Sequence, residues 1–242
     1  MNIALIGYGK MGKAIEEIAL NAGHTILSRI DYNDDVHKGL TGADVAIEFT
    51  HPEAAKANIL KCFEAKVPVI VGTTGWYKHF DEIKALALKT GNSLFYATNF
   101  SLGVNIFFEL NKHLASLMNS HEMYEPEMEE IHHIQKKDAP SGTAITLAEG
   151  LIANLDRKKT WVNREAENNF SIEPLALNII SKREAEVPGT HTLSYKGIND
   201  TITITHQAFN RLGFATGAVK AAEWLYGKKG VYTMTDMLGY QS

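Results

Sequence analysis

The sequence predicts an α/β fold in which a doubly wound parallel sheet is joined to an α+β region whose sheet is mixed or antiparallel. Three observations predict this class. In the first hundred residues, short apolar runs alternate with helical patterns, as in strands and helices of a parallel sheet. Beyond residue 100 the alternation stops, and strand patterns follow one another. A glycine-rich turn near the start joins a strand pattern directly to a helix pattern, which is typical of a Rossmann-type sheet.

The elements of the first hundred residues follow from their apolar spacing. Short apolar runs predict strands at 2–6, 25–30, 43–49, 68–71 and 93–97. Apolar residues repeated at helical spacing predict helices at 10–22, 53–63 and 80–89. Gly23 stands where the first helix ends, and Pro52 where the second begins, which are positions that these residue types favour.

The second half has a different rhythm. Apolar spacing predicts helices at 103–118, 141–154 and 213–226, and extended segments at 122–134, 177–181, 190–196 and 201–207. The polar stretch 156–174 is expected to be irregular. The short connection 197–200 predicts antiparallel pairing of the last two strands. Because the closing helix can return to the first sheet, we expect residues 1–100 with 212–242 to form one domain, and 101–211 the other.

Composition excludes several classes of protein. The 242 residues carry 24 basic and 28 acidic side chains, for a net charge of −4, so we expect neither a nucleic-acid partner nor an anionic membrane partner. No apolar run approaches the roughly 20 residues that span a bilayer. The single cysteine, Cys62, cannot form an internal disulfide. A cytoplasmic location is therefore expected.

The glycine-rich turn has the spacing G-x-G-x-x-G. Its glycines allow a tight turn and close approach of the backbone to a pyrophosphate, and the helix start offers N–H donors to phosphates. Between a strand and a helix, this spacing indicates dinucleotide binding, and a purely structural turn is the alternative. The predicted cofactor contacts are Gly7, Tyr8, Gly9, Lys10, Met11 and Gly12.

An acidic residue and two further turns extend the predicted cofactor site. Asp31 ends the second strand, where a carboxylate binds the adenosine ribose and repels a 2′-phosphate. NADH is therefore favoured over NADPH, although Arg29 and Lys10 could bind that phosphate, and a solvated aspartate is the alternative. Two turns at later strand ends suit contact with a nicotinamide; their residues are Gly72, Thr73, Thr74, Ala97, Thr98, Asn99 and Phe100.

The densest reactive chemistry lies in residues 130–143. His132 can transfer a proton near neutral pH, and Lys136 supplies a positive charge or a proton. Ser141 fits a helix N-cap, so Gly142 and Thr143 would present N–H groups to an anion such as a carboxylate.

Three other interpretations of these residues are a solvated loop, a metal site and a nucleophile. A solvated basic loop would also account for the lysines. A metal site would need a cysteine, a third histidine or a well-spaced carboxylate beside the histidine pair; none is evident in the sequence, so no metal is expected. Cys62 lies within a helix pattern and Ser141 has the character of a cap, so neither is expected to be a nucleophile.

Five stretches resemble the dihydrodipicolinate reductase (4-hydroxy-tetrahydrodipicolinate reductase) family of the diaminopimelate route to lysine, in order and in spacing. They are GYGKMG at 7–12, GTTG at 72–75, NFSLGVN at 99–105, EIHHIQKKDAPSGTA at 130–144 and ITHQAFNRLGFATGAVKAAEWL at 204–225. The resemblance covers essentially the whole chain. It implies a nucleotide domain completed by the closing helix, a central substrate domain whose sheet builds a homotetramer, and NAD(P)H-dependent reduction of a cyclic imine dicarboxylate with loss of water.

The resemblance also implies roles for single residues. It makes His132 a proton donor or acceptor and Lys136 a second proton donor, with His133, Gly142 and Thr143 as carboxylate ligands. The chain departs from the family's usual R-x-G-x-x-x-G-x-H run, since Ala185 replaces a glycine, and Pro188 with two glutamates alters the loop.

Two other functions remain open. One is an aspartate-type dehydrogenase of similar layout; a semialdehyde version would need a cysteine at a strand end, which Cys62 does not provide. The other is a sensor that binds NAD(P)H without turnover, which would need neither His132 nor Lys136.

Overall fold

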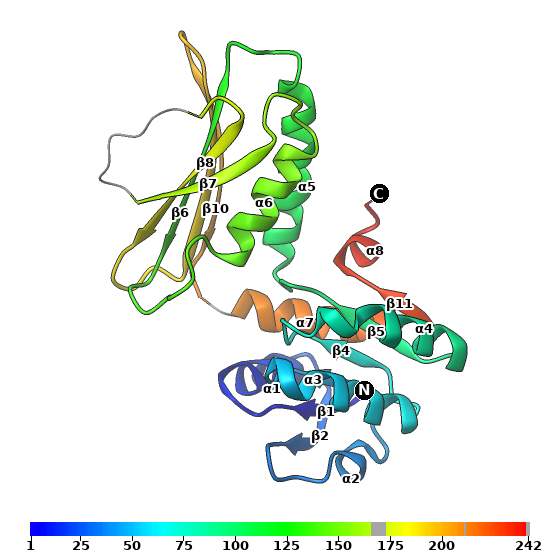
Figure 1. Cartoon of the computed structure of the whole chain (residues 1–242). Coiled ribbons are helices and arrows are strands. Elements are labelled where there is room, and N and C mark those ends of the chain that lie inside the picture. Colours follow the sequence, from blue (N-terminus) through cyan, green and yellow to red (C-terminus); the bar gives the residue numbers. More distant parts are fainter. Residues whose placement is uncertain (166–172, 211, 241–242) are drawn as a thin grey trace. The chain divides into compact units, whose positions relative to one another are not determined.

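The structure is a computed structural model that describes residues 1–165, 173–210 and 212–240. The chain divides into two compact units, Met1–Leu102 with Leu212–Ser242, and Gly103–Arg211 (Figure 1). Each unit has its own sheet and its own hydrophobic core. No helix in these residues is both long and apolar enough to cross a membrane.

The first unit is built on a parallel sheet. Among the described residues the strand order is β11-β5-β4-β3-β1-β2, and every neighbouring pair is parallel. The strands are β1 (Asn2–Ile6), β2 (Thr25–Ile30), β3 (Val45–Glu48), β4 (Val69–Val71), β5 (Ser93–Tyr96) and β11 (Gly230–Tyr232). The chain runs from β1 to β2 on one side and returns to β3 on the other. Ligands of open α/β sheets bind at such a switch point.

Helices cover both faces of this sheet. Ile3 and Leu5 of β1 pack into one hydrophobic cluster, with α1 and α7, whereas Ala4 and Ile6 pack into a second cluster with α3 and α4. Burial on both faces explains why β1 is a continuous apolar run. The helices are α1 (Lys10–Asn21), α2 (Val36–Leu40), α3 (Pro52–Glu64), the 3₁₀ turn Tyr77–His79, α4 (Phe80–Thr90), α7 (Leu212–Leu225) and α8 (Met234–Leu238).

Helix α7 comes from the far end of the chain and packs into the first core through small residues. A Cβ on Gly217 would lie 1.7 Å from the backbone oxygen of Phe100, so only glycine permits this approach. Ala215, Ala218 and Ala222 are fully buried beside it. Strand β11 then pairs with β5 and extends the sheet.

The second unit has a mixed sheet covered on one face by two helices. Its strand order in the described residues is β10-β9-β6-β8-β7; β6 is antiparallel to β9 and parallel to β8. Figure 1 shows both helices on the same side of this sheet. The elements are α5 (Leu102–Met118), β6 (Glu125–His132), α6 (Gly142–Ile152), β7 (Thr160–Glu165), β8 (Ala176–Arg183), β9 (Gly189–Lys196) and β10 (Thr201–Ala208). The predicted fold class is confirmed.

One expectation about this unit was wrong. Strand β7 lies within the stretch 156–174 that was expected to be irregular, of which residues 166–172 are outside the described part. Its pairing with β8, where Trp161 lies opposite Leu177, defines the strand. Its sequence, TWVNRE, has no sustained apolar run, so pairing with a neighbour determines its conformation.

Candidate functional site

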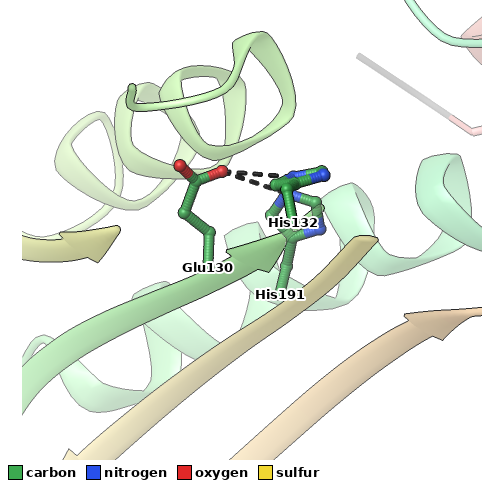
Figure 2. Close-up of side chains that lie close together, drawn as sticks. All are labelled: Glu130, His132 and His191. Atoms are coloured by element: carbon green, nitrogen blue, oxygen red, sulfur yellow. Dashed lines mark hydrogen bonds and ion pairs between the residues drawn. The ribbon is translucent and has the colours of Figure 1, made fainter. Parts of the chain in front are cut away.

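The sheet of the second unit places three ionisable side chains at one end of its helix-covered face. Met128, Glu130 and His132 alternate on the buried side of β6, because residues two apart in a strand share a face. In the antiparallel pair β6–β9, Glu130 lies directly opposite His191. Figure 2 shows the three polar side chains gathered above their strands.

Their polar atoms are in close contact. Nε2 of His132 lies 3.2 Å from Oε2 of Glu130 and 3.4 Å from Nε2 of His191. The same carboxylate oxygen lies 3.9 Å from Nε2 of His191. The residues are 0%, 8% and 4% exposed for Glu130, His132 and His191, so the cluster is shielded from solvent.

His132 is also held at its second nitrogen. Nδ1 lies 3.2 Å from the carbonyl oxygen of Pro188, which can only accept a hydrogen bond. The imidazole passes over Gly189, where a Cβ would lie 2.8 Å from its Cε1. A side chain at Gly189 would therefore collide with the imidazole. Pro188, which departs from the family pattern, holds the imidazole through its backbone carbonyl.

Glu130 is an ionised carboxylate despite its complete burial. Burial alone would raise its pKa, but hydrogen bonds from His132 and Ser141 outweigh that effect and hold the pKa of Glu130 well below the usual range. The backbone N–H of Ser141 lies 3.2 Å from both oxygens, and Nη2 of Arg183 lies 3.1 Å from Oε1. Burial lowers the pKa of His191 to about 3, so this imidazole is neutral at pH 7.

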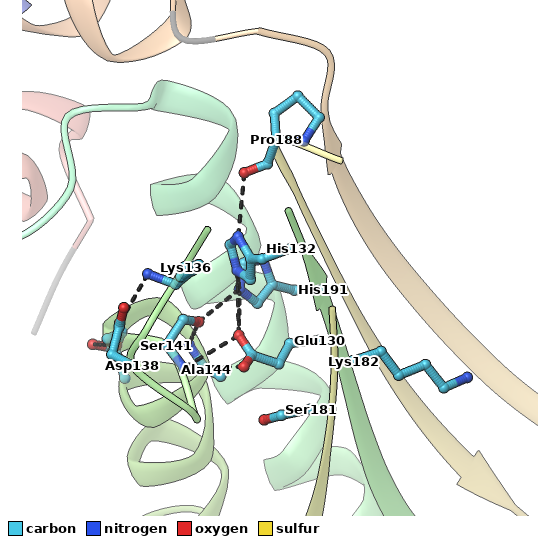
Figure 3. Close-up of polar contacts among 12 residues, drawn as sticks. Glu130, His132, Lys136, Asp138, Ser141, Ala144, Ser181, Lys182, Pro188 and His191 are labelled. Carbon is cyan, nitrogen blue, oxygen red and sulfur yellow. Dashed lines mark hydrogen bonds and ion pairs between the residues drawn. The ribbon is translucent and has the colours of Figure 1, made fainter. Parts of the chain in front are cut away.

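The start of α6 completes the site (Figure 3). Ser141 caps the helix by accepting the N–H of Ala144 at 3.2 Å, and its hydroxyl lies 3.1 Å from Nε2 of His191. Gly142 is exposed, and a Cβ there would meet nothing within 4 Å. The helix start is thus open to an approaching anion. Thr143 is half-buried beside it.

The loop between β6 and α6 carries the remaining predicted residues. Nζ of Lys136 is paired with Oδ2 of Asp138 at 2.8 Å. Arg183 fixes the loop, since its guanidinium donates to the backbone oxygens of Lys136 at 3.3 Å and Asp138 at 2.6 Å. Nδ1 of His133 is buried with no hydrogen-bond partner among the described residues.

The structure adds three residues that the sequence analysis did not select: Glu130, Arg183 and His191. The structure also contradicts the premise on which no metal was expected, that no carboxylate or third histidine accompanies the histidine pair. Glu130 and His191 both lie beside His132. Two sequence patterns could have pointed to these residues. Glu130 and His132 are two residues apart in an extended segment, so they share a face, and Arg183 and His191 belong to the run that resembles the family's R-x-G-x-x-x-G-x-H pattern. Neither pattern shows the strand pairing that brings the two segments together.

In the first unit, the glycine-rich turn lies between two cavities of about 490 Å³ each. The first is lined by the loops after β1, β2 and β3, including Gly7, Tyr8, Gly9 and Asp31. The second is lined by residues that include Gly9, Lys10, Met11, Gly72, Thr73 and Thr74. Most of the predicted cofactor contacts therefore lie along one continuous rim.

The predicted cofactor-site glycines are required for different physical reasons, and Gly12 lines neither cavity. Gly7 has a φ of +93°, and a Cβ there would lie 2.1 Å from the oxygen of Phe49. A Cβ on Gly12 would lie 2.3 Å from the oxygen of Gly7, and one on Gly72 would lie 2.1 Å from the Phe49 ring. At Gly9, by contrast, nothing lies within 4 Å. Packing explains three of the glycines, and Gly9 is left open toward the cavities.

Arg29 and residues 97–100, which were expected near the cofactor, have contacts of their own within the first unit. The guanidinium of Arg29, considered for a 2′-phosphate, is paired with Glu16, which also accepts from Tyr8. Residues 97–100 line neither cavity. Ala97 and Phe100 are buried in the first core, Asn99 accepts the N–H of Ser101 at 2.9 Å, and Thr98 is exposed.

Comparison with known proteins identifies the family. The family model described as "Dihydrodipicolinate reductase, N-terminus" matches residues 1–100, and "Dihydrodipicolinate reductase, C-terminus" matches residues 103–238. A 4-hydroxy-tetrahydrodipicolinate reductase of Christiangramia forsetii is 47% identical over 241 residues, covering 98% of both chains. A reductase of the same name from Neisseria gonorrhoeae is 38% identical, covering 93% of this chain and 84% of the relative.

A solved structure agrees with the fold. The dipicolinate-bound dihydrodipicolinate reductase from Paenisporosarcina sp. TG-14 superposes with a TM-score of 0.78 over 98% of both chains, at 21% identity. At that identity the likeness concerns the fold alone, whereas the family models and the sequence relatives cover nearly every residue. The chain belongs to the dihydrodipicolinate reductase family.

Proposed function

We propose that this chain reduces 4-hydroxy-tetrahydrodipicolinate to tetrahydrodipicolinate in lysine and diaminopimelate biosynthesis, with the residues around His132 as its active site. The reaction consumes one NAD(P)H and one proton and releases NAD(P)⁺ and water. The cofactor supplies the hydride, and the protein supplies orientation and protons. The observation that carries this proposal is the buried Glu130–His132–His191 cluster beside an open helix start.

The residues of the first unit fit a dinucleotide. Gly9 has no steric reason to be glycine except close approach of a ligand, and it lies where the two cavities meet. Gly7, Tyr8, Lys10, Met11 and Gly12 would surround the pyrophosphate at the start of α1. The turns at 72–74 and 97–100 would hold the nicotinamide end, with Thr73 and Thr98 as hydrogen-bonding groups.

We infer that NADH is preferred over NADPH. The exposed carboxylate of Asp31 lines the first cavity, where it can accept hydrogen bonds from a ribose and repel a 2′-phosphate. Arg29, the nearby cation that could offset this repulsion, is engaged by Glu16. Lys10 remains as the positive group for NADPH.

The substrate is a small cyclic dicarboxylate, and the second unit offers groups for it. Gly142 and Thr143 lie at the start of α6, where the helix dipole favours a carboxylate. Nδ1 of His133 has no hydrogen-bond partner among the described residues, and Lys136 lies in the same loop. These residues would hold the two carboxylates, with Ser141 fixing the helix start through its cap.

His132 and Lys136 would supply the protons. Nε2 of His132 lies 3.2 Å from Oε2 of Glu130, and this contact holds the imidazole in position for proton transfer. The ammonium of Lys136 can leave Asp138 and turn toward a substrate, because Asp138 lies exposed on the loop surface. Loss of water removes one ring proton while the leaving hydroxyl is protonated, and the ring that accepts the hydride then takes up the one proton that the net reaction consumes. These proton transfers are the tasks available to His132 and Lys136.

We propose further that four chains assemble through the helix-free face of the second sheet. That face carries hydroxyls paired across β9 and β10, with Thr192 3.1 Å from Thr205 and Ser194 3.1 Å from Thr203. Ion pairs join Glu129 to Lys182 and Glu127 to Lys196 on the same face. The short hydroxyl side chains of β9 and β10 suit packing of one sheet on another.

The decisive experiment is a coupled assay in which the hydroxy-tetrahydrodipicolinate is generated in situ and NADH or NADPH oxidation is recorded. Oxidation of either nucleotide is expected only when the cyclic dicarboxylate is supplied. Oxidation with aspartate semialdehyde alone would identify the dehydrogenase alternative instead. Nucleotide binding without any oxidation would identify a sensor.

A further inference from the structure

Three side-chain atoms in the second unit converge on one point. They are Nε2 of His132, Nε2 of His191 and Oε2 of Glu130, separated by 3.2, 3.4 and 3.9 Å (Figure 2). A point equidistant from these atoms lies about 2 Å from each, which is the length of a Zn–N or Zn–O bond. Triads of two imidazoles and a carboxylate are established ligand sets for transition metals.

The hydrogen bond at the other nitrogen of His132 suits metal binding at Nε2. Because the carbonyl of Pro188 can only accept, Nδ1 of His132 carries a hydrogen, and Nε2 can present a lone pair to a metal ion. That lone pair faces Oε2 of Glu130 and Nε2 of His191. A metal ion between the three atoms would bond to each of them.

We propose that a divalent transition metal ion of the Zn²⁺ class binds Glu130, His132 and His191. Binding forms bonds from the lone pairs of the two Nε2 atoms and of Oε2, and any proton on these atoms is released to solvent. The hydroxyl of Ser141, 3.1 Å from Nε2 of His191, or a water molecule can take the fourth position.

The surrounding groups fit such a site. The carbonyl of Pro188 orients His132, and the N–H of Ser141 orients Glu130, as outer partners do for metal ligands. Two imidazole donors select Zn²⁺, Co²⁺ or Cu²⁺ over Mg²⁺ and Ca²⁺, which prefer oxygen. Arg183 beside Glu130 opposes the added charge, so reversible binding is expected rather than a permanent structural ion.

A metal ion here would inhibit the enzyme. Once Nε2 of His132 is bound to metal, it has no proton to give to the substrate. This consequence rests on the proposed function, whereas the binding does not. Zinc would therefore act as a reversible inhibitor that competes with the catalytic proton.

Binding is tested first, without substrate or nucleotide. The untagged chain is treated with EDTA, desalted and titrated with Co²⁺ while visible absorption is recorded. We expect one ion per chain, with the intense visible bands of a four- or five-coordinate site, displaced by Zn²⁺. The absence of saturable binding would overturn the proposal.

Variants locate the site. His191→Gln and His132→Gln should each weaken Co²⁺ binding about tenfold or more. His206→Gln is the matched control, because His206 lies opposite His191 in the β9–β10 register and is not one of the three ligands. The affinity of this variant for Co²⁺ should equal that of the wild type. Each variant's fold is checked by circular dichroism. Equal affinity in wild type and both ligand variants would also overturn the proposal.

Inhibition is tested second, at buffered free Zn²⁺, since the substrate's carboxylates also bind metal. Turnover should fall with rising free Zn²⁺ and return with EDTA. For each protein, activity is expressed relative to its own activity in EDTA. Half-inhibition of His191→Gln should then require about tenfold more free Zn²⁺ than half-inhibition of the wild type. Zinc binding without loss of turnover would refute the inhibitory role. No turnover in EDTA would reject the proposed function, and the Co²⁺ titration would still decide the metal site.

Discussion

His132 owes its surroundings to Glu130 on the same strand and to residues that lie far from it in sequence. Glu130 and Pro188 occupy its two nitrogens, and Gly189 provides the space for its ring. The imidazole is therefore fixed in orientation. A histidine in a solvated loop would lack this property.

Replacing His132 by Gln should reduce kcat by roughly 10²–10⁴ while leaving nucleotide affinity nearly unchanged. The reason is that glutamine fills similar space but cannot transfer a proton. Steady-state kinetics and NADH titration check this. His121→Gln, an exposed histidine beyond α5, is the control, and unaltered turnover in His132→Gln would remove this residue from the mechanism.

Asp31→Ala should weaken NADH binding more than NADPH binding, because it removes a ribose acceptor from one nucleotide and a repulsive charge from the other. Fluorescence titration with both nucleotides measures the ratio of the two affinities. Glu53→Gln removes another negative charge from the same cavity and should leave that ratio unchanged. Equal losses for both nucleotides in Asp31→Ala would exclude the ribose contact.

Glu48 should give the first unit a specific pH dependence. Burial raises the pKa of this carboxyl above its ordinary value of 4.5, and one of its oxygens has no partner among the described residues. A raised pKa means that the folded state binds the proton more tightly, so its contribution to stability is present at low pH and lost as pH rises.

Thermal melts of Glu48→Gln and wild type from pH 4 to pH 8 check this dependence. The difference in Tm should move in favour of the variant as pH increases above about 4.5, since glutamine has no charge to bury. Each kcal/mol corresponds to roughly 2–4 °C in a chain of this size. The exposed Glu17 on α1 supplies the control, Glu17→Gln; a constant difference for Glu48→Gln would contradict the prediction.

At the scale of elements, β9 joins the site to the sheet through its first and third residues. Gly189→Ala should push the His132 ring from its position, since the added Cβ would lie 2.8 Å from Cε1, and kcat should fall about tenfold or more. The residue that follows the other end of the same strand, Gly197, offers a matched control. A Cβ on Gly197 would lie 2.8 Å from the ring of Tyr124.

Both alanine variants should lower Tm to a similar extent, because both displace an aromatic or imidazole ring. Only Gly189→Ala should lose turnover, because only His132 is proposed to act in the reaction. Kinetics and thermal melts of the two variants separate these effects. An equal loss of kcat in Gly197→Ala would mean that strain in β9, rather than the position of His132, is responsible.

At the scale of the whole molecule, light scattering in solution should give the mass of four chains of 26.8 kDa. Thr203→Arg places a long charged side chain among the paired hydroxyls of the helix-free face and should yield a smaller species. Ser120→Arg, at an exposed turn after α5, should leave the mass unchanged. A monomeric wild type would reject the assembly.

The sequence by itself determined the fold class, the parallel sheet of short apolar strands in the first unit, and the family. Those properties depend on local spacing: β1, β2 and α4 begin where apolar periodicity begins. Local periodicity failed for α2, α8 and β11, which have at most five residues each, and for β7. Segments this short, or this polar, owe their conformation to packing and strand pairing.

Only the tertiary structure decided the surroundings of His132. The motif that contains this residue is continuous in sequence, but Arg183 and His191 reach it from β8 and β9, more than fifty residues away. Hydrogen bonds between strands set the register that places Glu130 opposite His191. Because that register depends on pairing between distant segments, no local pattern could reveal that two histidines and a carboxylate share one buried point.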